Sequence, residues 1–328
     1  MATFKNRENP ILEVKNLCMT FSTKKRGRSK VVKAVDNVSF DVMKGEVFGL
    51  VGESGCGKTT TGRTIIRLYN PLSGEVKYNG RVISGKLDKD THQYITDNIA
   101  MIFQDPIASL NPRMTVAEIV GEGLKIRGMN DLNERNAKVI EMLGKVGLAP
   151  EHATRYPHEF SGGQRQRIGI ARALAVNPTM LIADEPVSAL DVSVQAQVIN
   201  LINDLKDEYG LTVLFIAHNL SVVKYFCDRI GVMYYGKLVE VADGDDLFRH
   251  PIHPYTRALL SAIPSPDPHQ EKRRKKLVYD PSVHQYGGDK QPSYQEYAPG
   301  HSVYCTPEEL AAWDAEVEQQ LATKGLRG

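Results

Sequence analysis

The stretch EVFGLVGESGCGKTT, residues 46–60, decides the fold of this chain. Its first six residues form a mostly apolar run of the kind that becomes a buried strand, and the next six are rich in glycine. Residues 58–69 follow, with isoleucine and leucine where a helix packed on a sheet would bury them. Strand, glycine-rich loop and helix in this order predict an α/β fold that binds phosphate groups.

The loop matches the pattern G-x-x-x-x-G-K-[ST], whose glycines let successive backbone N–H groups face an anion. Lys58 is expected to reach the outer phosphates and the Thr59 hydroxyl to bind Mg²⁺, while the helix start adds positive charge. Cys56 is either a small neutral spacer or a site of oxidation, and the spacer is favoured because the loop uses its backbone there. The predicted phosphate-binding residues are Gly52, Glu53, Ser54, Gly55, Cys56, Gly57, Lys58, Thr59 and Thr60.

A second element, TMLIADEP at residues 179–186, is an apolar strand that ends in two carboxylates. Adjacent residues at a strand end point in different directions, so Asp184 can hold the metal through its hydration shell while Glu185 faces an attacking water. Phosphoryl transfer to water needs this kind of positioning more than it needs covalent chemistry. Taken alone, such a pair is equally consistent with two solvated side chains.

The rest of the chain supplies further elements of an α/β fold. We expect an antiparallel β layer, a helical lobe, and then two apolar strands joined by a helix, which is the rhythm of a parallel sheet. The β layer covers 11–21 and 31–48 with turns at Asp36-Asn37 and Lys44-Gly45; the lobe covers about 105–160 with helices at 116–126 and 134–146; the strands cover 180–183 and 212–217 with a helix at 194–209. From Pro251 onward the chain is rich in proline, tyrosine and charge, and it is expected to form an appendage.

Composition limits the classes of function. Of the 328 residues, 41% are hydrophobic and 24% are charged, which is ordinary for a globular protein. The net charge of +2 gives no reason to expect nucleic acid as a partner. Two basic runs, at 24–30 and 272–276, are interpreted as solvated loops, with contact to a phosphate backbone or to lipid as the alternative.

Cysteine content and hydropathy indicate the compartment. The cysteines are Cys18, Cys56, Cys227 and Cys305, and they form no CxxC pair, which favours reduced thiols in a cytosolic protein. Residues 1–10 are polar, unlike a secretion signal, and no apolar run is long enough to cross a bilayer. Any association with a membrane is therefore expected to be peripheral.

The run HEFSGGQRQR, residues 158–167, contains a second helix start of the kind that binds anions, at Ser161-Gly162-Gly163-Gln164. Its position between the phosphate loop and the carboxylate strand resembles the signature of the ATP-binding-cassette (ABC) ATPases. The resemblance covers residues 11 to about 266. It implies a P-loop NTPase cassette of the α/β class, with a RecA-like core, an antiparallel β subdomain and a helical subdomain, and it implies ATP and Mg²⁺ as ligands.

In that family two cassettes pack head to tail, so that the phosphate loop of one and the signature of the other bind the same ATP. The resemblance therefore implies that Ser161, Gly162, Gly163 and Gln164 contact ATP held by a partner. Residues 188–191 resemble the loop that crosses the dimer interface. Phe21 resembles the aromatic residue that stacks on adenine, with an ordinary core phenylalanine as the alternative.

The resemblance also implies roles in hydrolysis. Gln104 would link Mg²⁺ and water to the helical lobe, and His218, which follows the last apolar strand, would contact the γ-phosphate. The end of a central strand is where α/β folds place their ligands. The implied catalytic residues are Glu185, His218 and Gln104, and the implied metal-binding residues are Thr59, Gln104 and Asp184.

Three further segments, at residues 103–113, 156–160 and 253–264, resemble the ATPases of oligopeptide and dipeptide importers. Among these ATPases the chain most resembles the F-type subunit. The implied organisation is an ATPase domain at 11–250, with its helical subdomain at about 105–160, followed by a C-terminal extension at 251–328. Many relatives hold an iron–sulfur cluster in a cysteine-rich extension, but only Cys305 is present here, so no cluster is expected. The tail at 277–328 resembles the cysteine-poor form of Gram-positive oligopeptide systems.

Such a chain is expected to work within a larger assembly on the cytoplasmic side of the cell membrane. The implied partners are a second, D-type ATPase subunit in a head-to-tail heterodimer, two transmembrane permease subunits and an extracytoplasmic peptide-binding protein, with no nucleic acid. Importers of nickel or other small solutes share much of the pattern and are an alternative, as is a subunit whose own ATP site is degenerate. A soluble cassette protein of translation or DNA repair is a further alternative, but those proteins carry two cassettes, long coiled coils or zinc modules, which are not found here.

Overall fold

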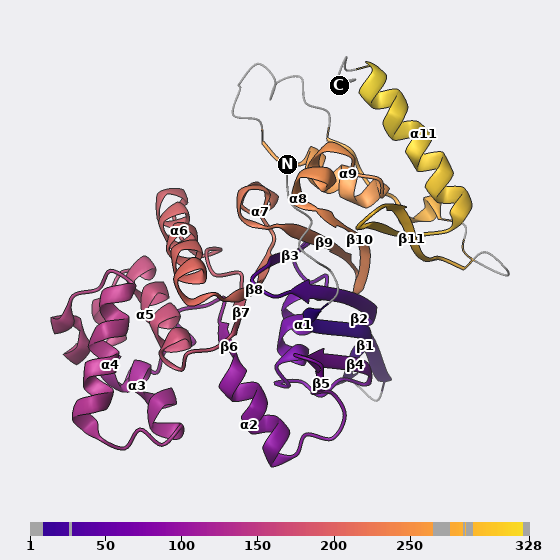
Figure 1. Cartoon of the computed structure of the whole chain (residues 1–328). Helices are drawn as coiled ribbons and strands as arrows, with labels where there is room; N and C mark the ends of the chain where they lie inside the picture. Colours follow the sequence, from indigo (N-terminus) through magenta and orange to yellow (C-terminus); the bar gives the residue numbers. More distant parts are fainter. Residues whose placement is uncertain (1–8, 26–27, 265–275, 285, 287–290, 324–328) are drawn as a thin grey trace.

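The computed structural model describes residues 9–25, 28–264, 276–284, 286 and 291–323. Within them the chain forms two β-sheets, with a group of helices at one end of the larger sheet and a tail at its other end (Figure 1). Parts of the two basic runs, residues 26–27 and 272–275, lie outside the described residues. None of the described helices is long and apolar enough to cross a membrane.

The larger sheet has eight strands, and its middle is parallel. Strands β9, β3, β8, β7 and β6 run in one direction, while β10, β12 and β11 continue the sheet by antiparallel pairing beside β9. In spatial order the strands are β11 (Ser293–Ala298), β12 (His301–Cys305), β10 (Lys237–Asp243), β9 (Arg229–Tyr234), β3 (Val47–Val51), β8 (Thr212–Ala217), β7 (Met180–Asp184) and β6 (Ile99–Ile102). The expected strands at 180–183 and 212–217 are confirmed as β7 and β8, and the helix between them is α6 (Val192–Tyr209).

Both faces of the parallel strands are buried, which explains why their sequences are continuous apolar runs. In β8, Val213 and Phe215 join the core shared with the helical lobe, whereas Leu214 and Ile216 join the core under the smaller sheet. Strands β3 and β7 alternate in the same way. The larger sheet therefore separates two hydrophobic cores and is held from both sides.

The smaller sheet is antiparallel, as the predicted β layer requires. Its strands are β2 (Arg28–Met43), β1 (Pro10–Lys25), β4 (Ser73–Tyr78) and β5 (Arg81–Val82), in spatial order. The turn expected at Asp36-Asn37 is wrong, because both residues lie inside β2, where Asn37 has a φ of 58° and donates its N–H to Cys18 Sγ. The register with β1 shifts at this point, so the two residues form a bulge.

The expected second segment of the β layer, 31–48, also extends too far. Strand β2 ends at Met43, the chain turns through Gly45, and residues 47–48 belong to β3 in the other sheet. Thr212 fixes this turn by accepting a hydrogen bond from the Gly45 N–H at 2.9 Å. The transition between sheets thus occurs at the Lys44-Gly45 turn that the sequence predicts.

Helices α3, α4 and α5 pack on one another and form the helical lobe (Figure 1). They are α3 (Val116–Ile126), α4 (Leu132–Lys145) and α5 (Gly162–Ala175), joined by the short 3₁₀ helices η1 (Pro150–Thr154) and η2 (Pro157–Glu159). Thr115, Asp131 and Ser161 cap the three helices through their side chains. The helix expected at 116–126 is confirmed, and the one expected at 134–146 begins earlier because its cap is Asp131.

Helix α1 (Lys58–Ile65) is shorter than the helix expected over 58–69. Arg67 has a φ of 64°, which is incompatible with a continuing α-helix. Its guanidinium donates to the carbonyl oxygens of Ile83 and Gly85, so a buried arginine ties the chain to the segment beyond β5. The remaining helices are α2 (Lys89–Asn98), α7 (Leu220–Phe226), α8 (Gly244–Arg249), α9 (Pro254–Ser261), η3 (Pro281–Val283) and α11 (Pro307–Thr323).

The tail, which was expected to be an appendage, is built into the larger sheet. Strand β12 pairs with β10, and β11 pairs with β12, so the sheet is extended beyond the parallel strands. Trp313 and Val317 of α11 form a small core with Ile252, Val303 and Cys305. Helix α11 lies at the opposite end of the molecule from the helical lobe (Figure 1).

A buried ion pair fastens the tail to the sheet. His301 of β12 is 1% exposed, and its two ring nitrogens lie 2.8 Å from Glu240 Oε1 and 2.6 Å from Asp246 Oδ2. Glu240 also accepts hydrogen bonds from the backbone N–H groups of Ile252 and His253. Burial by itself would lower the pKa of His301, but the two carboxylates outweigh burial and raise that pKa. His301 is therefore a cationic partner for buried Glu240.

Replacing His301 with glutamine should lower the free energy of unfolding by about 3 kcal/mol, because Glu240 would keep a buried charge without a cationic partner. Urea titrations of both proteins measure the difference. Since the pKa of His301 is raised, its contribution is complete below the ordinary value of 6.5 and is lost as pH rises through the raised value. The difference between wild type and variant should therefore shrink at alkaline pH.

The matched control is His250→Gln, which removes a half-exposed imidazole that also contacts Asp246. We expect a change of less than about 1 kcal/mol there, because the pair is solvated. A difference for His301→Gln that grows with rising pH would contradict the cationic assignment.

Candidate functional site

The parallel strands deliver the predicted site residues to one edge of the larger sheet. Val51 at the end of β3 pairs with Ala217 at the end of β8, and Asp184 at the end of β7 pairs with Ile216. Ile102 at the end of β6 pairs with Ala183. The residues that follow these strands therefore lie along the same edge of the sheet, although they are far apart in the sequence.

The phosphate loop lies against the rest of the fold through its backbone. Gly57, with a φ of 111°, comes so close to β2 that a Cβ atom there would lie 2.1 Å from the carbonyl oxygen of Ala34. The Cys56 carbonyl accepts a hydrogen bond from the Gly236 N–H at 2.7 Å, in the turn between β9 and β10. The first N–H groups of α1 have no partner within the helix and are available to an anion.

The thiol of Cys56 points into the protein and is 5% exposed. Burial raises its pKa, against the opposing effect of Lys58, whose Nζ lies 3.9 Å from Sγ. A thiol that stays protonated is a poor nucleophile. This environment supports the interpretation of Cys56 as a spacer.

Lys58 is 3% exposed, and its ammonium group is held over the loop. Its Nζ donates to the carbonyl oxygens of Gly52 at 2.8 Å and Glu53 at 2.9 Å. The same Nζ lies 3.8 Å from Glu185 Oε1. A single cation therefore connects the phosphate loop to the carboxylate at the end of β7.

Asp184 and Thr59 form the metal-binding candidate. The Thr59 hydroxyl donates to Asp184 Oδ1 at 2.7 Å, and Arg63, one turn later on α1, lies 3.6 Å from Oδ2. Asp184 is fully buried, and its Oδ2 has no hydrogen-bond partner among the described residues. Burial raises the pKa of this carboxyl, which Thr59 and Arg63 partly offset.

A buried carboxylate oxygen that has an ion pair but no hydrogen bond, close to a hydroxyl, suits a hard cation that keeps most of its waters, as Mg²⁺ does. Arg63 is a residue that sequence analysis missed. Its spacing of four from Thr59 on one helix gives the signal that could have found it.

Glu185 stands at the centre of the predicted catalytic residues. Its Oε2 accepts a hydrogen bond from Gln104 Nε2 at 3.0 Å and lies 3.0 Å from His218 Nδ1. The backbone of Glu185 is in the left-handed region, with a φ of 45°, and its N–H donates to the Ile216 carbonyl. Non-glycine residues held in this region cost about 1–3 kcal/mol and are concentrated at functional sites. The backbone thus turns sharply at Glu185, which lets the Asp184 and Glu185 side chains point in different directions.

Residues 161–164, which resemble the family signature, lie apart from the phosphate loop. Ser161 caps α5, accepting from the Gln164 N–H at 3.3 Å, while the Gln164 side chain accepts from the Ser161 N–H at 3.0 Å. Gly163 packs on α6, where a Cβ atom would lie 2.7 Å from Val194 Cγ1. No hydrogen bond or ion pair joins residues 161–164 to residues 52–60 in the part of the chain that the structure describes. Figure 1 places α5 within the lobe, apart from α1.

Phe21 is exposed near the end of α1. Its ring meets that of Tyr69 edge-on, with centroids 5.4 Å apart, and 36% of its surface is accessible. This leaves a ring that a planar base can contact, and among the described residues the ring contact found for Phe21 is with Tyr69, which is not one of the other predicted site residues.

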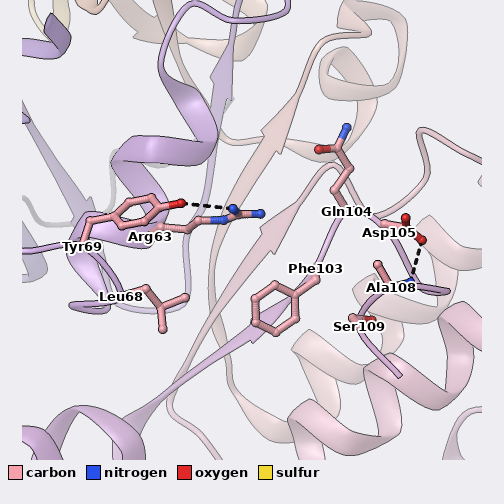
Figure 2. Close-up of a pocket in the computed structure, with 8 residues that line it drawn as sticks. All are labelled: Arg63, Leu68, Tyr69, Phe103, Gln104, Asp105, Ala108 and Ser109. Carbon is pink, nitrogen blue, oxygen red and sulfur yellow. Dashed lines mark hydrogen bonds between the residues drawn. The ribbon is translucent and has the colours of Figure 1, made fainter. Parts of the chain in front are cut away.

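A pocket of about 480 Å³ lies beside the site, between α1 and the start of the helical lobe (Figure 2). It is lined by Arg63, Leu68, Tyr69, Phe103, Gln104, Asp105, Ala108 and Ser109. Asp105 holds the lobe side of the pocket by accepting from the Ala108 N–H at 3.0 Å, and Arg63 meets the Tyr69 hydroxyl on the other side. Gln104 is shared between this pocket and Glu185, so the pocket and the predicted catalytic residues are physically connected.

Two families match the sequence: "ABC transporter" over residues 35–188, and "Oligopeptide/dipeptide transporter, C-terminal region" over residues 239–289. The "Oligopeptide transport ATP-binding protein OppF" of Bacillus subtilis (strain 168) is 59% identical over 92% of this chain and 98% of its own length. The "Dipeptide transport ATP-binding protein DppF" of Lactococcus lactis subsp. cremoris (strain MG1363) is 52% identical over 95% of this chain and 98% of its own length. The solved dimer of the ATP-binding cassette MJ0796 bound to ADP and Pi is similar with a TM-score of 0.64 at 31% identity, covering 71% of this chain and 98% of that one.

Proposed function

The chain belongs to the ABC ATPases of oligopeptide and dipeptide transporters, and we propose that it hydrolyses ATP at the sheet edge with Glu185 as the general base. The observation that carries the proposal is the convergence of Gln104, His218 and Lys58 on the Glu185 carboxylate. Its relatives are named for both oligopeptide and dipeptide transport, which favours peptides over nickel as the substrate class.

Each residue in this group has a task that its geometry supports. Lys58 is placed to neutralise the outer phosphates, and Gln104 and His218 orient Glu185 to receive a proton from water. Thr59 and Asp184 would hold Mg²⁺, which neutralises charge on the phosphates. Hydrolysis by this arrangement depends on orientation and electrostatics, as phosphoryl transfer requires.

We infer a head-to-tail heterodimer with a second ATPase subunit. The support is the separation between the two anion-binding helix starts: the signature at 161–164 has no polar contact with residues 52–60 among the described residues. The similar cassette MJ0796 is known as a dimer. Each ATP would then lie between the phosphate loop of one subunit and the signature of the other.

The partners beyond the dimer are membrane permease subunits, as the transporter family implies. We propose that a permease segment docks in the pocket lined by Phe103 and Ala108, because Gln104 connects that pocket to Glu185. The chain would then lie on the cytoplasmic face of the cell membrane. An extracytoplasmic binding protein would choose the peptide.

Glu185→Gln should reduce the rate of ATP hydrolysis at this subunit's site by at least about 100-fold, because the amide cannot accept a proton from water. ATP affinity should stay within a few-fold of wild type, since Lys58 and the loop amides are intact. Steady-state phosphate release and binding of a fluorescent ATP analogue measure the two quantities. Lys58→Ala is the contrasting variant, in which affinity itself should fall. Hydrolysis that persists in Glu185→Gln would refute the assignment.

Ser161→Asp should prevent nucleotide trapping at the partner subunit's site, because a carboxylate would face the phosphates of that ATP. Both Asp and Asn preserve the helix cap, so Ser161→Asn is a neutral control with the same fold. Vanadate trapping with a photoreactive ATP analogue, followed by separation of the two subunits, shows which one is labelled. We expect Asp to abolish the partner's label, with Asn much milder; a partner label as strong with Asp as in wild type would exclude the head-to-tail arrangement.

Ala108→Trp should fill the pocket and weaken assembly with the permease subunits, while ATP binding by the free chain remains unchanged. Ala137→Trp is the matched control, because that exposed alanine lies on α4 away from the pocket. Co-purification from membranes with tagged permease subunits reports the assembly. Normal recovery of the permease with Ala108→Trp would show that the docking surface lies elsewhere.

A further inference from the structure

The segment His253-Pro254-Tyr255-Thr256 has no part in the chemistry described so far, yet it reaches the phosphate loop. The Tyr255 hydroxyl accepts a hydrogen bond from the backbone N–H of Glu53 at 3.2 Å. Tyr255 is 2% exposed, so water does not compete freely for this bond. A residue from the C-terminal region thus contacts the second residue of the loop, 202 positions earlier in the sequence.

The sequence around Tyr255 fixes this side chain in place. His253 caps α9, its Nδ1 accepting from the Tyr255 N–H at 3.1 Å, and Pro254 occupies the first helical position, which suits proline. Burial lowers the pKa of His253 to about 3, so the imidazole stays neutral and keeps its acceptor nitrogen. The Tyr255 ring packs against Tyr234 and Tyr279, with centroids 4.4 Å and 5.5 Å away.

The Glu53 N–H needs a partner that does not interfere with phosphate binding. The Glu53 N–H belongs to the Gly52–Glu53 peptide, whose carbonyl oxygen accepts from Lys58 Nζ at 2.8 Å. The next carbonyl, that of Glu53, accepts from Lys58 Nζ and from the Cys56 N–H, so both peptides are part of the turn that shapes the loop. Burial raises the pKa of Tyr255, which keeps the phenol neutral at the edge of an anion site. A neutral hydroxyl satisfies the amide without repelling ATP.

We propose that Tyr255 is a positioning residue of the ATP site, which holds the phosphate loop in its binding conformation through the Glu53 amide. The proposal rests on the proposed ATPase function of the same loop. Without the hydroxyl, the Gly52–Glu53 peptide loses the bond to its N–H and keeps only the one from Lys58 Nζ to the Gly52 carbonyl, so the peptide can turn its N–H toward water. The binding-competent loop then becomes a fraction of the population, and the apparent Kd rises by the inverse of that fraction.

The test is Tyr255→Phe in the full chain, which removes one oxygen and keeps the ring. We expect the Kd for ATP and the KM to rise five- to tenfold, the upper value corresponding to about 1.4 kcal/mol. The kcat should stay within twofold of wild type, because bound phosphates restore the loop. Equal KM values for Tyr255→Phe and wild type would overturn the proposal, as would a fall in kcat with KM unchanged.

Tyr279→Phe is the matched control, since its hydroxyl meets His284 on the far side of the same aromatic group. It should leave the KM for ATP unchanged at a similar Tm. If Tyr279→Phe raised the KM as much as Tyr255→Phe, the effect would belong to the packing of the group, and Tyr255 would have no special role.

A double-mutant cycle identifies the hydrogen bond itself. Glu53→Pro removes the N–H donor, so Tyr255→Phe should have little further effect on ATP affinity in that background. A full additive loss would overturn the proposal. Lys58→Ala in the same binding assay separates the two hypotheses: if wild type and Lys58→Ala bind ATP alike, the ATP site itself is wrong, whereas a loss in Lys58→Ala alone refutes only the role of Tyr255.

Discussion

The parallel register of β3, β8, β7 and β6 is the constraint on which the site depends. Because side chains alternate between two faces, a slip of one residue in β7 would exchange Ile182 and Ala183 between the two cores. The same slip would carry Asp184 away from Thr59 and Glu185 away from Lys58. The burial of both faces therefore fixes the relative positions of the proposed catalytic residues, and the apolar residues of the sheet are as necessary to the proposed ATP site as the polar ones.

Local signals in the sequence predicted much of the fold. The strand–loop–helix around Lys58, the helix after Thr115 and the strands β7 and β8 follow from nearby residues alone. The predictions are wrong where contacts with residues far away in the sequence determine the local structure. Arg67 ends α1 because carbonyls beyond β5 receive its guanidinium, and Asn37 forms a bulge because β1 lies alongside. The tail strands could not be foreseen, because they form only against β10.

The candidate site shows the same division. Lys58, Thr59, Asp184 and Glu185 could be grouped from motifs at strand ends, and Gln104 and His218 from the family resemblance; the structure brings these residues into contact. Their roles in hydrolysis remain predictions. Arg63 and Tyr255 were not foreseen: the first is one helix turn from Thr59, while the second contacts Glu53 from 202 positions later in the sequence. A contact of that range depends on how α9 packs, which no local pattern encodes.

The pairing of β12 with β10 has a consequence for how the chain is made. Until β12 is synthesised, β10 is an open edge whose unpaired N–H and C=O groups can pair with another chain. Residues 244–300 must leave the ribosome before that edge can be covered. The nascent chain therefore passes through an interval in which this edge is exposed to strand-to-strand aggregation, and the interval ends only when β12 has been synthesised and pairs with β10.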